Sequence, residues 1–355
     1  MISKKIGQVL EIEKENADIQ WIKVTIDEQL FSAINYPTAT GTVKPGDEVV
    51  LNTTAVEHGL GTGGYHIVML NLSSIESKAK EPGHIMKLRY TPFQIKVLAV
   101  EEQGNPHHGE ISDFKDLNNI PVMIGSLHSK LAPAALGYKL MNPNGKLVYI
   151  MTDGGALPLA FSKTVPVLKE QGLIDGTITV GHAYGGDYEA VNIYSGLIAA
   201  KEVLEADAVI ICMGPGVVGT GTKWGFTGIE QGDIINAVNV LKGRAIAIPR
   251  ITFKDKRDRH KGLSHHTLTI LEKVALQPAE VSLPVLPKEE NDYLKNQIRE
   301  RRLDDLHTFI TIDAEKVLDY AEHLNIPFST MGRSVEEERY YFLAAGAAGI
   351  LATQE

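Results

Sequence analysis

Short apolar stretches rich in β-branched residues dominate the chain up to residue 104, and none of them has the period of an amphipathic helix. Turn signals separate these stretches, among them Lys44-Pro-Gly-Asp47, Glu81-Pro-Gly83 and a glycine-rich segment at 59–64. The predicted strands are Gly7–Glu13, Gln20–Ile26, Glu48–Asn52, His66–Leu72, Ile85–Tyr90 and Phe93–Glu101. Many short strands without intervening helices predict a small all-β barrel or sandwich domain over residues 1–104.

From residue 105 onward, apolar runs alternate with segments of helical period. The runs predict strands at Ile120–Ile124, Leu147–Met151, Thr177–Val180, Ala208–Met213, Ala245–Pro249, Thr308–Ile312 and Ile326–Ser329. We interpret Pro278–Pro287 as an extended crossover, Lys288–Arg302 as a charged surface helix, and Ser334-Val-Glu-Glu337 as a capping box that opens the last helix. The predicted fold class is therefore α/β: a doubly wound, mostly parallel, Rossmann-like sheet of about six or seven strands over residues 105–355, preceded by the small β domain.

The charge balance narrows the range of partners. The formal net charge is −9, from 35 Lys and Arg against 44 Asp and Glu, which argues against a nucleic-acid or anionic-membrane binder. The single cysteine, Cys212, can form neither an intrachain disulfide nor a CxxC metal site, and this suits a reducing cytosol. The longest apolar run, Phe342–Ala352, is too short to span a bilayer, and no targeting segment is visible. We expect a cytoplasmic protein that forms a homodimer, since most soluble oligomers are symmetric homo-oligomers.

Candidate chemistry gathers directly after the predicted strands. Ligands bind outside the carboxyl ends of the strands in a parallel sheet, and five of these ends carry Ser, Thr, His, Asp or Arg, in most cases beside glycine. The candidate ligand-binding residues are Ser126, His128, Thr152, Gly154, Gly155, Asp187, Gly214, Gly216, Gly219, Thr220, Gly221, Thr222, Arg250 and His266. We expect one cavity at this edge of the sheet, lined by Ser126, Asp153, His182, Gly216 and His265.

Three of these positions are candidate catalytic residues. Asp153 precedes two glycines that would let a substrate approach the backbone closely, and His182 follows the next strand. Ser264 is the predicted N-cap of a helix that places His265 in its first turn, where the helix dipole disfavours the imidazolium and leaves a neutral base. A metal site of His128, Asp153, His182 and His265 is the weaker alternative, because no HExxH spacing supports it. A Ser–His–Asp triad is weaker still, because the chain has no GxSxG motif.

The glycine-rich segment 214–223 matches the GxGxxG dinucleotide fingerprint at Gly214, Gly216 and Gly219 after a predicted strand. The following helix starts late, near Gly228, and Arg250 stands where an acidic residue would bind a ribose. We interpret the segment as a loop of exposed backbone N–H groups and hydroxyls that cradles an anion, with a packing turn as the alternative. The basic run 250–261, with six Lys and Arg against two Asp, would add positive charge at the same edge.

Four segments together resemble a bacterial family that is classed only as a domain of unknown function. They are Met-Thr-Asp-Gly-Gly-Ala-Leu-Pro158, Gly-His-Ala-Tyr-Gly-Gly-Asp187, Met-Gly-Pro-Gly-Val-Val-Gly-Thr-Gly221 and Gly-Leu-Ser-His-His266. The resemblance covers nearly the whole chain and implies no activity, substrate, cofactor or catalytic residue.

Three classes of function follow from the pattern. The first is an enzyme that acts on a small anionic metabolite, phosphorylated or nucleotide-like, with Asp153 and a histidine as acid and base. The second is a ligand-binding or regulatory protein that uses the same pocket without chemistry. The third is an NADP-dependent oxidoreductase, which the late helix and the position of Arg250 disfavour. The density of ionisable residues at the strand ends favours the enzyme, and the reaction type does not follow from the sequence.

Overall fold

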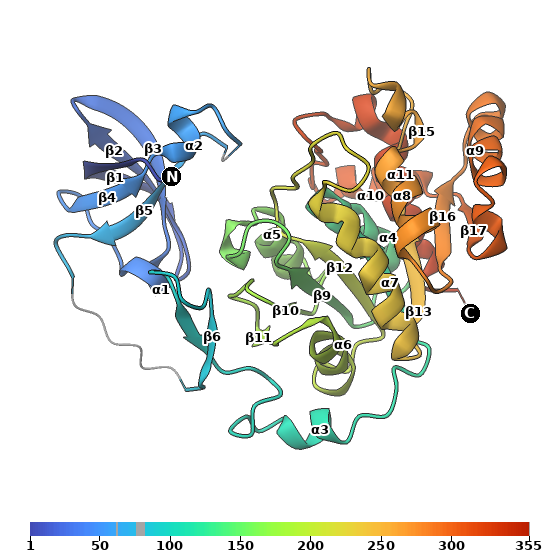
Figure 1. The fold of residues 1–355 in the computed structure, drawn as a ribbon, viewed down its shortest axis with the longest axis horizontal. Coiled ribbons are helices and arrows are strands. Elements are labelled where there is room, and N and C mark those ends of the chain that lie inside the picture. The colour runs from blue at the N-terminus through green and yellow to red at the C-terminus, as the bar shows by residue number, and fades with distance from the viewer. Residues whose placement is uncertain (62, 76–81, 355) are drawn as a thin grey trace. The chain divides into compact units, whose positions relative to one another are not determined.

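The computed structural model describes residues 1–61, 63–75 and 82–354 and divides the chain into two compact units, Met1–Val97 and Leu98–Glu355 (Figure 1). The glycine-rich segment 59–64 of the first unit contains residue 62, which lies outside the described residues. Each unit has an apolar core of its own, so each is described by itself below.

The first unit is built around a closed five-stranded barrel with the strand order β1-β2-β3-β5-β4. The strands are β1 (Lys4–Glu15), β2 (Gln20–Ile26), β3 (Gln29–Asn35), β4 (Glu48–Asn52) and β5 (His66–Asn71), accompanied by the short helices α1 (Pro37–Thr40) and α2 (Thr54–Glu57). Alternate residues point inward, so that Ile22, Val24 and Ile26 of β2 are buried. Two further strands, β6 (Ile85–Lys87) and β7 (Ile95–Val97), pair with each other in a separate antiparallel ribbon. The predicted small all-β domain is confirmed as a barrel.

Strand β3 is the barrel strand that the sequence pattern does not predict. It follows β2 through the two residues Asp27 and Glu28, whose φ angles are 50° and 65°. Two-residue hairpin turns with positive φ usually carry Asn-Gly or Asp-Gly, because those residues tolerate this conformation. Two consecutive acidic residues lack that signature, which leaves the turn invisible in the sequence.

The second unit contains an eight-stranded sheet whose strand pairs are all parallel, in the order β11-β10-β9-β12-β8-β13-β16-β17. Its strands are β8 (Pro121–Gly125), β9 (Leu147–Thr152), β10 (Gly176–Thr179), β11 (Tyr188–Glu189), β12 (Ala208–Met213), β13 (Arg244–Ile248), β16 (Glu280–Pro284) and β17 (Thr308–Ile312). Strands β14 (Ile251–Thr252) and β15 (Gly262–Leu263) form a separate hairpin. The helices are α3 (His108–Ser112), α4 (Leu131–Met141), α5 (Thr164–Glu170), α6 (Ile193–Glu202), α7 (Glu230–Val240), α8 (His265–Thr269), α9 (Lys288–Glu300), α10 (Glu315–His323) and α11 (Val335–Leu351).

Helices cover both faces of this sheet, as the predicted doubly wound fold requires (Figure 1). All six residues of β9 are buried: Leu147, Tyr149 and Met151 join the core that includes α4 and α11. Val148 and Ile150, between them, join the core that includes α6 and α7. A strand buried on both faces reads as a continuous apolar run, which is the pattern that identifies the parallel sheet in the sequence.

The apolar run 342–352 forms most of α11, and its glycines allow this helix to pack closely against α4. A Cβ atom at Gly349 would lie 2.1 Å from the carbonyl oxygen of Ala134, and one at Gly137 would lie 2.2 Å from that of Gly346. The two helix backbones therefore touch, and a side chain at either position would separate α4 from α11. No helix in the described ranges is long and apolar enough to cross a membrane.

Two local predictions differ from the structure. Residues 326–329 form no strand, and the predicted crossover 278–287 contains β16, which pairs with β13 and β17 inside the sheet. The prolines at both ends of that segment suggest a linker, but they flank the strand or occupy its last position, where a missing N–H does little harm. The capping interaction at the start of α11 is confirmed, since the backbone N–H of Ser334 donates to Glu337 at 3.0 Å.

Candidate active site

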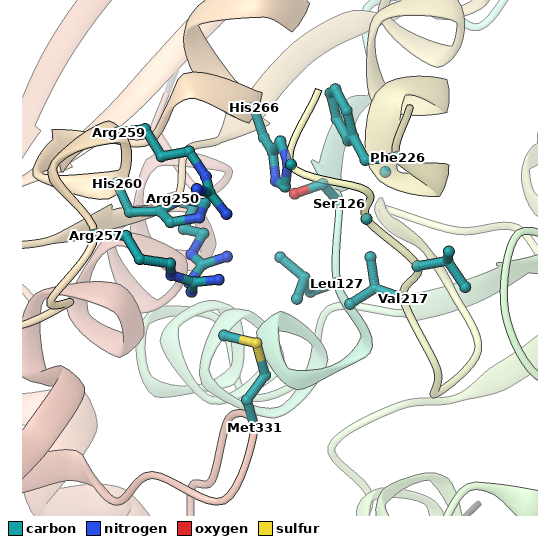
Figure 2. Close-up of a pocket in the computed structure, with 14 residues that line it drawn as sticks. Ser126, Leu127, Val217, Phe226, Arg250, Arg257, Arg259, His260, His266 and Met331 are labelled. Atoms are coloured by element: carbon teal, nitrogen blue, oxygen red, sulfur yellow. The ribbon is translucent and has the colours of Figure 1, made fainter. Parts of the chain in front are cut away.

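A cavity of about 200 Å³ lies in the second unit at the carboxyl ends of three adjacent strands, β12, β8 and β13 (Figure 2). The chain leaves β8 toward α4 on one face of the sheet and leaves β12 toward α7 on the other. Diverging connections of this kind open a crevice between the two strands, and ligands of open α/β sheets bind there. The residues that line the cavity are Ser126, Leu127, Val217, Val218, Gly219, Gly221, Phe226, Gly228, Arg250, Arg257, Arg259, His260, His266 and Met331.

The cavity includes part of the predicted site. Ser126, Gly219, Gly221, Arg250 and His266 line it. Asp153, His182, Gly216 and His265, which we expected in the same cavity, are not among the lining residues.

Three arginine side chains face this cavity from the segment that follows β13 (Figure 2). Arg250 is 5% exposed and is fixed by its backbone, whose N–H donates to Thr267 Oγ1 at 2.9 Å. Arg257 and Arg259 lie in the connection between β14 and β15. The short hairpin thus folds the basic run of the sequence back onto the sheet edge.

A buried carboxylate organises part of this positive charge. The Asp255 side chain is 4% exposed, and its Oδ2 lies 2.7 Å from Arg257, 3.3 Å from Arg250 and 3.6 Å from Arg333. Hydrogen bonds from Arg257 hold the pKa of Asp255 well below its usual range. Arg333 also pairs with Glu338, so that three guanidinium groups share two carboxylates and an excess of positive charge remains.

Arg259 differs from the other two arginines of the cavity. Among the described residues, no carboxylate lies within 4.0 Å of its guanidinium group. It lies against Gly221, where a Cβ atom would be 3.5 Å from Arg259 Nη2 and where φ is 78°. The glycine-rich loop therefore makes room for a guanidinium group that has no anionic partner in this part of the protein.

Histidines form the wall beside the arginines. Ser264 caps α8 as predicted, accepting a hydrogen bond from the N–H of Thr267, and this places His265 and His266 in the first turn. The His266 ring stacks on Phe226 with the ring centroids 4.0 Å apart, and the His260 ring lies 5.4 Å from that of His266.

These histidines are neutral at neutral pH. Burial, with the neighbouring histidines and arginines, lowers the pKa of both His260 and His266 to about 3. The pKa of His265 is also lowered, mainly by burial. Two buried ring nitrogens, His260 Nδ1 and His265 Nε2, have no hydrogen-bond partner within the described part of the chain. Such atoms are costly unless water or a ligand satisfies them.

Ser126 follows the last residue of β8, the strand between β12 and β13, and contacts a buried lysine. Lys130 is completely buried, and its Nζ lies 3.1 Å from Ser126 Oγ and 2.6 Å from the carbonyl oxygen of Ile248. In the described part of the chain no carboxylate lies within 4.0 Å of that amine. Burial, together with Arg250, lowers the pKa of Lys130 to about 7.

The predicted residues after β9 and β10 hold their loops together. Asp153 is exposed, and its Oδ2 accepts a hydrogen bond of 2.9 Å from the backbone N–H of His182. Thr152 donates to Glu230, the first residue of α7, at 2.5 Å. Burial raises the pKa of Glu230 to about 7, with a smaller contribution from Asp153. A second group of carboxylates therefore lies beside β9, outside the cavity.

The glycines after β9 and β12 serve close packing. A Cβ atom at Gly155 would lie 2.3 Å from the carbonyl oxygen of Gly214, and one at Gly214 would lie 2.4 Å from that of Ala156. A Cβ atom at Gly154 would lie 3.2 Å from a carboxylate oxygen of Glu230. Gly216 has a φ of 108°, which favours glycine. Part of the GxGxxG match is thus explained by the contact between two loops.

Four other predicted residues form hydrogen bonds within the protein. Thr220 and Thr222 hydroxyls lie 2.9 Å apart and close the turn onto Gly225. Asp187 lies level with the start of β10, where it accepts hydrogen bonds from Thr177 and Lys169. His128 contacts Ser162 and Tyr149 through its two ring nitrogens, and burial lowers its pKa to about 4. The structure thus gives each of these residues a structural contact.

The residues that sequence reasoning did not single out are Lys130, Arg257, Arg259, His260 and Met331. Arg257, Arg259 and His260 belong to the basic run, whose charge was the available signal. Lys130 carries no such signal, because a lysine before an apolar helix resembles an ordinary surface residue.

The four residues of the alternative metal site are not arranged as one. Within residues 1–61, 63–75 and 82–354, no group of three His, Cys, Asp or Glu side chains is placed to hold a metal ion.

The fold and the cavity define an α/β protein with a parallel sheet, a cationic pocket at its carboxyl edge and an N-terminal β-barrel. The family model described as "Protein of unknown function (DUF3866)" matches residues 32–349, so the chain belongs to this family. Comparison with curated proteins gives no match. The family match confirms the resemblance to a domain of unknown function that the sequence motifs indicated.

Proposed function

We propose that the cavity binds a small, strongly anionic metabolite, such as a phosphorylated one, and that the protein is an enzyme that acts on it. The observation that carries the proposal is the set of three arginines, Arg250, Arg257 and Arg259, on one small cavity (Figure 2). Arginine suits this task because its planar, always charged guanidinium group forms paired hydrogen bonds with phosphate and carboxylate oxygens.

The charge of the cluster supports an anionic ligand. The carboxylates of Asp255 and Glu338 form the ion pairs of Arg250, Arg257 and Arg333. Arg259 adds a fourth positive charge, with no carboxylate within 4.0 Å among the described residues. The histidines add hydrogen-bonding nitrogen without adding charge, since they are neutral. A dianionic phosphate group would balance the remaining positive charge.

The size of the cavity favours a small ligand over a dinucleotide. Its volume of about 200 Å³ lies below the roughly 300–1,000 Å³ that is typical of sites for drug-sized ligands. The late start of α7, at Glu230, also removes the helix N-terminus that a dinucleotide pyrophosphate uses. Both points weigh against the NADP-dependent oxidoreductase.

Thermal denaturation of the full chain during phosphate and pyrophosphate titrations tests the proposal. A ligand at about 100 times its Kd stabilises a protein by about 2.7 kcal/mol, which for a unit of this size raises Tm by roughly 5–10 °C. We expect Arg259→Gln to remove most of this shift, because Arg259 has no other anion in the described part of the chain.

Arg299→Gln is the matched control. Arg299 is exposed on α9 and does not line the cavity, so its loss removes the same charge without removing a contact. Equal shifts in wild type, Arg259→Gln and Arg299→Gln would show that the anion effect is not located in this cavity. No shift in wild type with either ligand would contradict the proposal as a whole.

A further inference from the structure

We infer that Ser126 and Lys130 form a nucleophile–base pair that removes a phosphoryl group from the bound metabolite. This inference rests on the proposed function, because the arginines must first hold the phosphoryl group beside Ser126. It assigns the chemistry to Ser126 in place of Asp153, which lies outside the cavity.

The position of Ser126 is the first argument. It comes directly after β8, lines the cavity, and is 4% exposed. Gly228 lies close to it, since a Cβ atom at Gly228 would be 3.0 Å from that of Ser126. In Figure 2 the Ser126 side chain and the guanidinium groups of Arg250, Arg257 and Arg259 lie around the same space. A phosphoryl group held by these arginines would therefore have a hydroxyl group available to it.

The position of Lys130 is the second argument. Its Nζ is within hydrogen-bond distance of Ser126 Oγ, and its other hydrogen-bond partner among the described residues is the carbonyl oxygen of Ile248, which accepts a hydrogen bond but donates none. The amine also lies 5.9 Å from the ring centroid of Tyr341. A neutral Lys130 can donate to Ile248 and at the same time accept the proton of Ser126.

The electrostatic environment keeps this base available. Burial and the nearby Arg250 disfavour the ammonium form, so that at neutral pH a large share of Lys130 is the free amine. A lysine with a carboxylate partner would remain protonated and could not act as a base. Serine–lysine pairs of this geometry recur as an alternative to the Ser–His–Asp triad.

The proposed reaction has two steps. In the first, Ser126 Oγ forms a bond to phosphorus, and the bond from phosphorus to the leaving oxygen breaks. Lys130 takes the serine proton, and the leaving oxygen departs as the anion, as acetate does from acetyl phosphate, or takes a proton from water. In the second, water attacks phosphorus and the bond from phosphorus to Ser126 Oγ breaks. Lys130 returns its proton to Oγ, and inorganic phosphate leaves with the protons of the water. The arginines stabilise the charge on the phosphoryl oxygens in both steps.

Acetyl phosphate is the probe, because it is small and offers Ser126 either a phosphoryl or an acetyl group. The full chain is incubated with it, denatured, and its peptides are analysed by mass spectrometry before and after acid treatment. We expect an acid-stable phosphoryl group on Ser126 in wild type and none in Ser126→Ala. Lys130→Met should label at least roughly 100-fold more slowly, since a general base contributes at least this factor.

Two further variants separate chemistry from structure. Lys130→Arg keeps a charged donor for Ile248 but has no free amine, so it should label as slowly as Lys130→Met. Ser129→Ala changes the same turn at a residue that contacts Tyr341 and Thr330, and it should label at the wild-type rate. Wild-type labelling in Lys130→Arg would overturn the role of Lys130 as the base.

Other outcomes overturn the inference directly. An acetyl group on Ser126 would indicate acyl transfer, and an acid-labile phosphoryl group would indicate a nitrogen nucleophile such as a histidine or Lys130. An unlabelled Ser126 in a wild-type chain that phosphate stabilises would refute the inference while leaving the proposed function standing. The phosphate-dependent Tm shift, measured on the same wild-type preparation, keeps the two proposals distinguishable.

Discussion

The loops that follow β8, β12 and β13 and those that follow β9 and β10 lie at the same edge of one parallel sheet. Both sets carry Ser, Thr, His or charged residues beside glycine or in a basic run. In the first set, Arg259 has no carboxylate within 4.0 Å among the described residues, and His260 has a buried nitrogen without a partner. In the second set, Asp153 accepts a hydrogen bond from the backbone N–H of His182 in the neighbouring loop.

The difference shows that polar residues at strand ends are of two kinds. Residues that hold a loop in place have their hydrogen-bonding capacity met by the protein. Residues that bind a ligand have charges or hydrogen-bonding groups without a partner in the protein. This lowers the stability of the free protein, and the bound ligand restores it. The two kinds of residue look the same in the sequence. The unpaired charges and hydrogen-bonding groups can be identified only when the contacts of each side chain are known.

The largest expected effect is that of Asp255→Asn, which removes the carboxylate shared by Arg250, Arg257 and Arg333. Breaking a buried ion pair by removing one partner costs about 3–5 kcal/mol, because it leaves buried charge uncompensated. For a unit of this size we expect a fall in Tm of roughly 6–20 °C in a buffer without phosphate or sulfate. Phosphate should restore more stability to the variant than it adds to wild type.

Asp258→Asn is the control for this prediction. Asp258 lies three residues further along the same basic run and is exposed, so the substitution should change Tm little. If Asp255→Asn were as stable as wild type in a buffer free of anions, the surplus of positive charge would not exist.

A smaller effect is expected on acidification. The pKa of His260 is about 3 in the folded chain and about 6.5 when unfolded, so between these values the unfolded state binds more protons. Its contribution to stability is therefore complete above pH 6.5 and is lost as the pH falls toward 3. In urea unfolding between pH 6.5 and 4.5, His260→Gln should reduce the slope of stability against pH by about 1 kcal/mol per pH unit.

The exposed His323 at the end of α10 provides the comparison. His323→Gln should keep the wild-type slope. An unchanged slope in His260→Gln would mean that His260 is free to take up a proton in the folded chain, and that the wall of the cavity is more polar than its geometry indicates.

Much of the fold could be predicted from the sequence, because strands buried on both faces leave an unmistakable apolar run. The strand ends of β8, β9, β12 and β13 located the loops correctly, and Ser264 was recognisable as a helix cap. Strand β16 was hidden because prolines flank it, and β3 because its turn uses two acidic residues.

The site could be predicted only in part, for a physical reason. Glycine marks both ligand approach and close packing, and Gly155 and Gly214 proved to serve packing, as their backbone contacts show. Lysine marks the surface, so that Lys130, buried against Ser126 by the turn between β8 and α4, gave no signal. In both cases the role of the residue depends on contacts with residues distant in the sequence, and a local sequence pattern does not reveal such contacts.

The smallest expected effect is that of Asp153→Ala, and it bears most directly on the comparison of the two loop sets. Asp153 is exposed and accepts one hydrogen bond from the backbone of His182, so its loss should cost roughly 0.5–1.5 kcal/mol, or a few degrees in Tm. The phosphate-dependent shift and the labelling of Ser126 should equal those of wild type, because Asp153 does not line the cavity. If the variant instead kept its stability and lost the anion response, the loop after β9 would belong to the site after all. Unpaired charges and hydrogen-bonding groups would then be a poor guide to function, because Asp153, whose carboxylate already accepts a hydrogen bond from the protein, would contribute to anion binding.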